Sequence, residues 1–238
     1  MHKIYQEILD AKENSQKLLA ILLDPDEIKL EILDVLISKI NQSPATHIFV
    51  GGSLVQTNQI DTIIQKIKQN CSLPILLFPG NPSQISKYAD GILFLNLISG
   101  RNPDYLIEHQ VNAVPIIENT DLEVISTGYI LVENGKQSAV ERISQTKPLD
   151  RNNIDYVTQT AKAGEYMGNK LIYLEAGSGA EKPIPLKMIE SVSNKINIPL
   201  IVGGGIRTKT GIENAFKAGA DLVVIGTAFE NNPNFFEE

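Results

Sequence analysis

Two glycine-rich turns near the C-terminal end of the chain are of the kind that binds phosphate. Residues 203–205 are Gly-Gly-Gly and follow the apolar run 199–202, while Gly226 and Thr227 follow the run 222–225. A glycine has no Cβ, so its backbone N–H can approach an anion closely. In (β/α)8 barrels, phosphate sites commonly form after the seventh and eighth strands. The sequence therefore predicts a phosphate site here, and the alternative is that these glycines only make tight turns.

Two acidic residues directly follow other apolar runs and could act on a phosphorylated substrate. Asp24 follows the run 18–23, and carboxylate oxygens are ligands that Mg²⁺ prefers. Its alternative role is the N-cap of the next helix, a role for which Asp26 is better placed. Glu175 follows the run 171–174, so we expect it to enter a partly dry pocket and orient or deprotonate a substrate hydroxyl. The alternative for Glu175 is a salt bridge inside a barrel mouth.

Further polar groups lie near these positions in the sequence. Ser53 ends a Gly-Gly-Ser turn and could offer its hydroxyl to a metal ion or a phosphate, or could cap a helix. Tyr173 shares a face with Glu175, because side chains in a strand repeat every two residues. Residues 177–179 could form a backbone nest for an anion. Arg207 could reach a phosphate or form an outward salt bridge.

The elements that must position these residues alternate along the chain. Short, mostly continuous apolar runs are typical of parallel strands buried on both faces. Helix-period segments lie between them, at 27–41, 152–167 and 210–218. One of nine apolar runs contains Pro115, which a central strand resists, so we assign that run to a crossover. The nine runs are 18–23, 47–50, 74–78, 91–95, 113–117, 128–132, 171–174, 199–202 and 222–225.

Eight strands and intervening helices predict a single modified TIM (β/α)8 barrel. Its active site would lie at the C-terminal ends of the strands. No linker or shift in composition divides the 238 residues, so we expect one domain spanning 1–238. The crossover between residues 78 and 91 is too short for a full helix, which predicts an irregular or missing third helix. The long polar stretch 133–150 is interpreted as a loop or hairpin.

Composition and charge exclude several classes of function. The chain has 21 Lys and Arg against 28 Asp and Glu, a net charge of −7, and no basic cluster, which argues against nucleic-acid binding. Its single cysteine, Cys71, excludes an internal disulfide and a cysteine-cluster zinc site. The polar N-terminus and the lack of an 18-residue apolar stretch predict no signal peptide and no membrane span, so the expected location is the cytoplasm.

A set of motifs, in order over nearly the whole chain, resembles the geranylgeranylglyceryl phosphate synthase family. The segments are LLDPD at 22–26, GGS at 51–53, GYILVE at 128–133, YLEAGSGA at 173–180, IVGGGIR at 201–207 and VVIGT at 223–227. The first and fourth together are the most specific. The family includes bacterial heptaprenylglyceryl phosphate synthases, which have a lysine two residues before the first-motif aspartate. Here that residue is Leu22, so the chain is more similar to the second, geranylgeranyl-type branch.

The resemblance implies a Mg²⁺-dependent prenyltransferase. It would join the sn-3 hydroxyl of sn-glycerol 1-phosphate to geranylgeranyl diphosphate through an ether bond. Asp24 and Ser53 match the family's metal positions, and Glu175 would accept the hydroxyl proton. The glycerol-phosphate positions match Tyr173, Leu174, Glu175, Ala176, Gly177, Ser178, Gly179, Gly204, Gly205, Gly226 and Thr227.

The same resemblance implies a homo-oligomer without a membrane span, for which peripheral contact with a membrane would suit the lipid product. The prenyl tail needs an apolar groove, for which 78–82, Tyr88 and 93–98 are candidates.

Three alternatives stay open at this point. The first is the heptaprenyl reaction, against which Leu22 argues. The second is another phosphate-handling barrel enzyme, such as a sugar-phosphate isomerase or aldolase. It would need a lysine Schiff base or an acid–base pair at the strand ends, and no lysine stands there. The third is a non-catalytic protein that holds a prenyl or glycerol phosphate, for which Asp24 and Glu175 would be dispensable.

Overall fold

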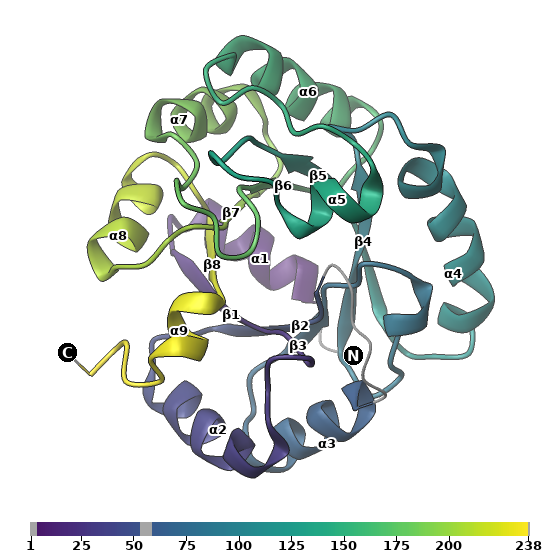
Figure 1. Ribbon diagram of the computed structural model, residues 1–238, viewed down its shortest axis with the longest axis vertical. Helices are drawn as coiled ribbons and strands as arrows, with labels where there is room; N and C mark the ends of the chain where they lie inside the picture. Colours follow the sequence, from purple (N-terminus) through teal and green to yellow (C-terminus); the bar gives the residue numbers. More distant parts are fainter. Residues whose placement is uncertain (1–3, 53–58, 238) are drawn as a thin grey trace.

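The computed structural model describes residues 4–52 and 59–237, and within them eight parallel strands close into a barrel in sequence order (Figure 1). The barrel closes where Ala20 pairs with Val224. This confirms the predicted TIM-barrel fold and its eight strands. The strands are β1 Leu18–Leu23, β2 His47–Val50, β3 Ile75–Leu77, β4 Gly91–Leu97, β5 Glu123–Leu131, β6 Leu171–Glu175, β7 Leu200–Gly203 and β8 Leu222–Ile225.

Helices surround the ring of strands because each presents one apolar stripe to it (Figure 1). In α2 the buried residues Leu33, Leu36, Ile37 and Ile40 follow helical spacing. No helix among the described residues is both long and apolar enough to cross a membrane. The described α-helices are α1 Ile4–Glu13, α2 Leu33–Gln42, α3 Ile60–Asn70, α4 His109–Ile117, α5 Ala139–Ser144, α6 Ile154–Tyr166, α7 Leu186–Lys195, α8 Lys209–Lys217 and α9 Thr227–Asn231.

The core has two layers. One lies between the strands and the surrounding helices, and the other fills the barrel interior. The N-terminal helix α1 closes the interior layer at the N-terminal ends of the strands, where Ile4 and Ile8 are buried. Glu123, at the start of β5, accepts hydrogen bonds from the N–H groups of Ile4 (2.5 Å) and Tyr5 (3.1 Å). The opposite end of the barrel is therefore the open one.

The crossover from β3 to β4 contains only a short 3₁₀ turn, Pro82–Gln84, in place of a full helix, as its length predicts. Asn81 stabilises this turn by accepting a hydrogen bond from the Ser83 N–H at 2.8 Å. The run 113–117 lies in helix α4, so its assignment to a crossover is also confirmed. The outer side of β3 and β4 therefore lacks the covering helix that other strands have.

Three predicted elements differ from the structure. The helix predicted from residue 27 begins at Leu33 with Ile32 at its N-cap, because a turn closed by the Glu27 N–H and the Asp24 carbonyl (3.0 Å) comes first. Neither Asp24 nor Asp26 is therefore its cap. Strand β5 begins at Glu123 rather than at residue 128. The search for continuous apolar runs missed its first residues because they alternate between more and less buried positions.

The stretch 133–150, predicted as a loop or hairpin, contains helix α5. Ser138 caps this helix by accepting a hydrogen bond from the Glu141 N–H at 3.1 Å. A serine followed three residues later by glutamate is a common helix-start pattern, and it was the available signal.

Replacing Ile8 by alanine is expected to destabilise the barrel without altering its open end. Ile8 is 1% exposed, and removing a buried isoleucine side chain typically costs about 2–5 kcal/mol. Urea unfolding measures the change in the free energy of unfolding. Met167→Ala is the control, since Met167 is 67% exposed and its change should stay within about 0.5 kcal/mol. Equal stability of the two variants would contradict the role of α1 as a barrel plug.

Candidate active site

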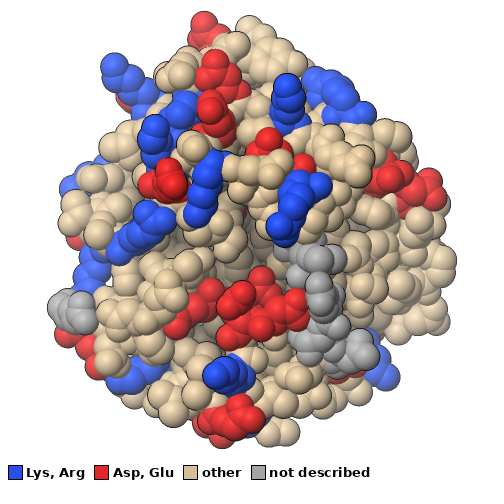
Figure 2. All heavy atoms as spheres, viewed as in Figure 1, with Lys and Arg blue, Asp and Glu red and all other residues tan. Residues whose placement is uncertain are grey.

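The C-terminal ends of the strands open on a cavity of about 350 Å³. Figure 2 shows the hollow at this face, with acidic residues gathered on one lip and basic residues across from them. The cavity is lined by strand ends and by residues of α5 and α9. Among the predicted site residues, those that line it are Asp24, Tyr173, Glu175, Ser178, Gly179, Gly204, Gly205, Gly226 and Thr227.

The two predicted phosphate turns meet at this cavity. Gly204 and Gly205 have φ angles of +82° and +71°, in the left-handed region that favours glycine. A Cβ at Gly204 would lie 2.3 Å from Glu175 Oε1, so glycine is needed for the ends of β6 and β7 to approach. The loops after β6 and β8 are joined through the Ser178 and Thr227 hydroxyls, 3.3 Å apart. Glycine backbone and hydroxyl donors from three strands therefore face one space.

Glu175 is a buried carboxylate at the end of β6, only 5% exposed. The Gly177 N–H donates a hydrogen bond to Glu175 Oε1 at 2.6 Å. Burial raises the pKa of Glu175 from its ordinary 4.5 to about 7, and the hydrogen bond from Gly177 limits that rise. A carboxylate with this pKa can both accept and release a proton near neutral pH.

Aromatic rings surround Glu175 inside the barrel. Tyr173 is fully buried, and its hydroxyl lies near the Glu175 carboxylate without a well-formed hydrogen-bond partner among the described residues. Burial, reinforced by the negative charge of Glu175, raises the pKa of both Tyr173 and Tyr129. The Phe78 ring stacks on Tyr173 with centroids 5.3 Å apart and lies 5.8 Å from Tyr129. The Tyr173 hydroxyl thus faces the Glu175 carboxylate, and its interaction with that carboxylate helps to limit the rise in the Glu175 pKa.

Three of the predicted glycerol-phosphate residues, Leu174, Ala176 and Gly177, do not line the cavity. Leu174 and Ala176 point outward into the layer between barrel and helices. The Ala176 N–H donates to the Gly203 carbonyl at 3.1 Å, and the Gly177 N–H is used by Glu175. Their side-chain direction follows from the two-residue period of a strand that places Tyr173 and Glu175 inside. These three residues shape the loop rather than offering side chains to a ligand.

Asp24 lies half-buried on the acidic lip of the cavity. Its Oδ1 accepts a hydrogen bond from the Asp26 N–H at 3.1 Å, and burial raises its pKa. A Cβ on Gly52 would lie 2.5 Å from Asp24 Oδ2, so a glycine at this position leaves room for the carboxylate. Ser53, the other predicted metal residue, lies outside the described residues.

The donor groups at this lip fit a magnesium ion that is held partly by substrate. Within residues 4–52 and 59–237, no cluster of three or more His, Cys, Asp or Glu side chains is arranged to hold a metal by itself. Mg²⁺ is usually bound through one or two carboxylates together with substrate phosphates and water. The Asp24 carboxylate, open to the cavity, matches that pattern.

Glu230 is a site residue that sequence analysis missed. It lies on α9, and its Oε1 accepts a hydrogen bond from the Asp24 N–H at 3.0 Å. Burial, with repulsion from the Asp24 and Glu27 carboxylates, raises its pKa to about 7. The only signal in the sequence was its place one helical turn after Gly226 and Thr227. Glu230 ties the C-terminal helix to the first-strand turn.

Arg207 lines the cavity and forms no ion pair with any residue that the structure describes, so the predicted outward salt bridge is absent there, while its contact with a phosphate stays a prediction. Its guanidinium donates hydrogen bonds to the carbonyls of Gly179 (3.3 Å) and Ala180 (2.6 Å). It therefore holds the loop after β6 in place. Leu22 also lines the cavity, next to Gly226, so an apolar side chain stands where the heptaprenyl branch has lysine.

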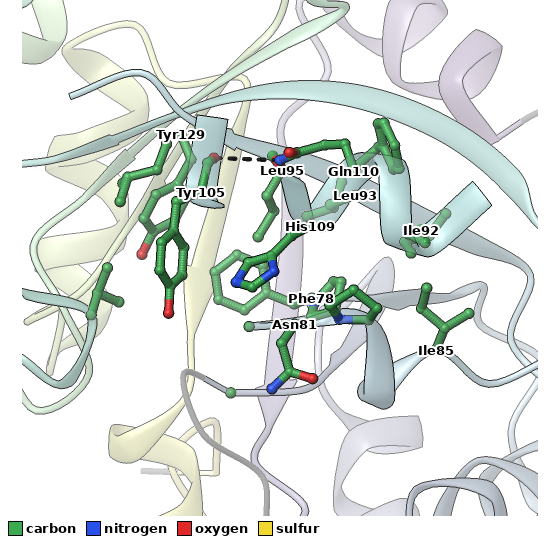
Figure 3. Close-up of a pocket in the computed structure, with 18 of the residues that line it drawn as sticks. Phe78, Asn81, Ile85, Ile92, Leu93, Leu95, Tyr105, His109, Gln110 and Tyr129 are labelled. Carbon is green, nitrogen blue, oxygen red and sulfur yellow. Dashed lines mark hydrogen bonds between the residues drawn. The ribbon is translucent and has the colours of Figure 1, made fainter. Parts of the chain in front are cut away.

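A second, apolar cavity of about 90 Å³ lies between the crossover that follows β3, strand β4 and helix α4, where the third helix is missing (Figure 3). It includes most of the predicted prenyl-groove segments, but not Tyr88, which packs against the outer core layer. The Gln110 amide donates to the Leu95 carbonyl along its wall. The apolar and polar cavities are adjacent, because five residues line both, namely Gly52, Phe78, Tyr129, Val140 and Ile143.

Known proteins are similar to this chain in both sequence and fold. The geranylgeranylglyceryl phosphate synthase of Flavobacterium johnsoniae is 64% identical over 234 residues, covering 98% of this chain and 96% of that protein. That of Zunongwangia profunda is 52% identical, covering 97% and 98%. The crystal structure of (S)-3-O-geranylgeranylglyceryl phosphate synthase from Thermoplasma acidophilum, in complex with its substrate sn-glycerol-1-phosphate, has a TM-score of 0.93 and 29% identity, covering 100% of this chain and 95% of that chain.

A family model agrees with these relatives. The model described as the PcrB family matches residues 11–238, nearly the whole chain. Together with full-length relatives at well over 30% identity, this match establishes the family. The chain therefore belongs to the PcrB family.

Proposed function

We propose that this chain is a geranylgeranylglyceryl phosphate synthase. The observation that carries the proposal is the junction of two unlike cavities. One is polar, with glycine turns and a buried carboxylate, and the other is an apolar groove that opens into it. Such a pair suits a reaction between a small phosphorylated alcohol and a prenyl diphosphate. The activity of the Flavobacterium and Thermoplasma proteins supports the same assignment.

In this proposal sn-glycerol 1-phosphate occupies the polar cavity. Its phosphate is held by the turns that contain Gly204, Gly205, Gly226 and Thr227, with Ser178 and Gly179 closing the site. The backbone of the loop after β6 supports it. A phosphate fixed there places the glycerol hydroxyls towards Glu175, and such positioning converts a bimolecular encounter into an oriented one.

Glu175 acts as the general base. Its Oε1 is occupied by the Gly177 N–H, which leaves Oε2 to accept the substrate hydroxyl. The bond between C1 of the prenyl chain and the diphosphate oxygen breaks, and its electron pair leaves with diphosphate. The sn-3 oxygen forms the new ether bond to C1, and its proton passes to Glu175.

The aromatic rings and the groove serve the prenyl donor. Phe78 and Tyr129 line both cavities, so they lie where C1 would be transferred. Aromatic faces attract positive charge, which favours the allylic cation character of C1 as the bond breaks. The prenyl tail lies in the apolar groove beside β3 and β4.

Asp24, at the acidic lip, is the proposed protein ligand of a Mg²⁺ ion, and the family resemblance adds Ser53, which lies outside the described residues. Bound there, the ion would neutralise charge on the diphosphate leaving group. The Asp24 carboxylate is held at the lip through its own N–H, which donates to Glu230.

The proposal includes a homo-oligomer in the cytoplasm. An apolar row of Ile107, Val111 and Val114 is exposed at 57%, 55% and 44%. Exposed apolar groups at helical spacing on the face of α4 and the turn before it suit burial against a second copy. The cytoplasmic location rests on the sequence expectation alone.

The proposal is tested by a transfer assay. Labelled sn-glycerol 1-phosphate is combined with C15, C20 or C35 prenyl diphosphate, with Mg²⁺ or with excess EDTA. We expect a Mg²⁺-dependent product that is formed fastest with the C20 donor. A C35 preference would indicate the heptaprenyl reaction. The absence of product from folded protein with every donor would favour another phosphate-binding barrel or a non-catalytic binder.

Glu175→Gln is expected to lower turnover by about 10²–10⁴-fold, because the amide cannot take a proton. In the wild type, kcat/KM should rise with pH to a plateau with a midpoint near 7, since the deprotonated carboxylate is the active form. Glu230 also titrates near 7, so the profile is repeated in Glu230→Gln, where the midpoint should persist. Wild-type turnover in Glu175→Gln would contradict the assignment.

A stability measurement shows whether the Glu175→Gln protein is intact. The folded-state pKa of Glu175 lies above its ordinary 4.5, so this group favours folding below that pH and loses the effect as pH rises through about 7. Relative to wild type, Glu175→Gln should therefore gain roughly 2–4 kcal/mol of unfolding free energy between pH 4 and pH 8. Urea unfolding at the two pH values measures this gain.

Glu230→Ala is expected to raise the Mg²⁺ concentration needed for half-maximal activity about tenfold. It removes the acceptor that holds the Asp24 N–H. Glu230→Gln keeps an acceptor oxygen, so its Mg²⁺ concentration for half-maximal activity should stay within about threefold of the wild-type value. Titration of Mg²⁺ binding by calorimetry gives a second readout that does not depend on turnover. Equal Mg²⁺ dependence of the alanine variant and the wild type would contradict the positioning role.

A further inference from the structure

Two arginines, Arg142 and Arg207, line the polar cavity, and they differ in what they contact. The Arg207 guanidinium is engaged by backbone carbonyls of the loop after β6. The Arg142 side chain is exposed and makes no ion pair or side-chain hydrogen bond with any residue that the structure describes. Arg142 is therefore a cation at the cavity that is free to meet a ligand.

The helix that carries Arg142 covers the junction of the two cavities. Val140 and Ile143, its neighbours on α5, each line both the polar cavity and the apolar groove. In the proposed reaction the prenyl tail lies in the groove and the glycerol phosphate in the polar cavity. The diphosphate, attached to C1, must then lie at the junction under α5. Arg142 is the cation on that helix that lines the polar side.

Helix α5 is held at both of its ends. The Ser138 hydroxyl caps its start, and the Asn102 side-chain amide donates to the Ser144 carbonyl at its end (2.8 Å). The start of α5 also packs on the loop after β6, since a Cβ on Gly177 would lie 2.8 Å from the Ser138 Cβ. A fixed helix loses little freedom when its side chain binds, which favours recognition of an anion.

Charge complementarity with a diphosphate favours a cation on the side of the polar cavity that carries α5. Asp24, Glu27 and Glu230 line the opposite lip, and Figure 2 shows acidic residues facing basic ones across the hollow. A diphosphate ester carries more negative charge than one divalent cation balances, and the acidic lip repels what remains. An arginine opposite that lip can form paired hydrogen bonds with phosphate oxygens.

From these observations we propose that Arg142 binds the diphosphate of the prenyl donor, on the side of the cavity opposite Asp24. It would hold the ground-state donor and then the departing diphosphate. The inference rests on the proposed prenyl transfer, but it concerns a binding contact that can be measured without turnover.

The test uses inorganic pyrophosphate with Mg²⁺ as the probe. Calorimetric titrations are made on the full chain with sn-glycerol 1-phosphate present to occupy the glycine turns. We expect Arg142→Ala to weaken pyrophosphate binding about tenfold or more, because hydrogen bonds to a charged group are lost. The pyrophosphate affinity of Arg142→Lys should lie between those of the wild type and Arg142→Ala, since lysine keeps the charge and loses the paired hydrogen-bond geometry.

Lys147→Ala is the matched control. Lys147 is an exposed cation five residues further on that does not line either cavity. The Lys147→Ala variant should bind pyrophosphate with an affinity within twofold of the wild-type value. Because Arg142 is exposed, both variants are expected to fold, and their thermal unfolding verifies this.

Kinetics separate the donor from the acceptor. In Arg142→Ala the KM for prenyl diphosphate should rise about tenfold or more, while the KM for sn-glycerol 1-phosphate stays within twofold. Pyrophosphate binding within twofold of wild type in Arg142→Ala would overturn the inference, whatever the kinetics. If the wild type forms no prenyl product, the proposed function fails, and the pyrophosphate titration still decides the role of Arg142.

Discussion

The close approach of the ends of β6 and β7 is the constraint on which the rest of the site depends. Gly204 passes so near the Glu175 carboxylate that a Cβ there would lie 2.3 Å from Oε1. This approach buries Glu175, while Gly177 N–H satisfies one of its oxygens. Burial then raises its pKa to about 7. The Glu175 carboxylate and the turn at Gly204 are thus positioned by one close backbone contact.

The missing third helix has an equally direct consequence. A short crossover leaves no full helix between β3 and β4, and side chains of the crossover, of β4 and of α4 then form an apolar groove. Because Phe78 and Tyr129 lie at its inner end, the groove opens into the polar cavity. A local shortage of chain therefore leaves an apolar groove beside the polar cavity.

The mouth of the barrel is electrostatically divided. Carboxylates of Asp24, Glu27 and Glu230 line one side, and Arg142 and Arg207 line the other. The Asp24 backbone is held by Glu230, so the first strand and the last helix form one acidic lip. Carboxylates that lie near one another repel, and this repulsion adds to burial in raising the pKa of Glu230. A cation bound between them would relieve that repulsion.

Local patterns in the sequence determined much of this protein. Continuous apolar runs predicted the strands, and Pro115 showed that the run 113–117 is not one of them. Glycines after the last two strands predicted the phosphate turns. Alternation of side chains correctly placed Tyr173 and Glu175 on one face. These features follow from spacing along the chain, so they can be derived without a fold.

Only the tertiary structure decided the contacts between distant segments. Glu230 meets Asp24 from 206 residues away, and Arg207 donates hydrogen bonds to the carbonyls of the loop after β6. Helix α5 contributes Val140 and Ile143 to the walls of both cavities. A carboxylate or an arginine is compatible with many partners, and closure of the barrel selects which ones come within reach.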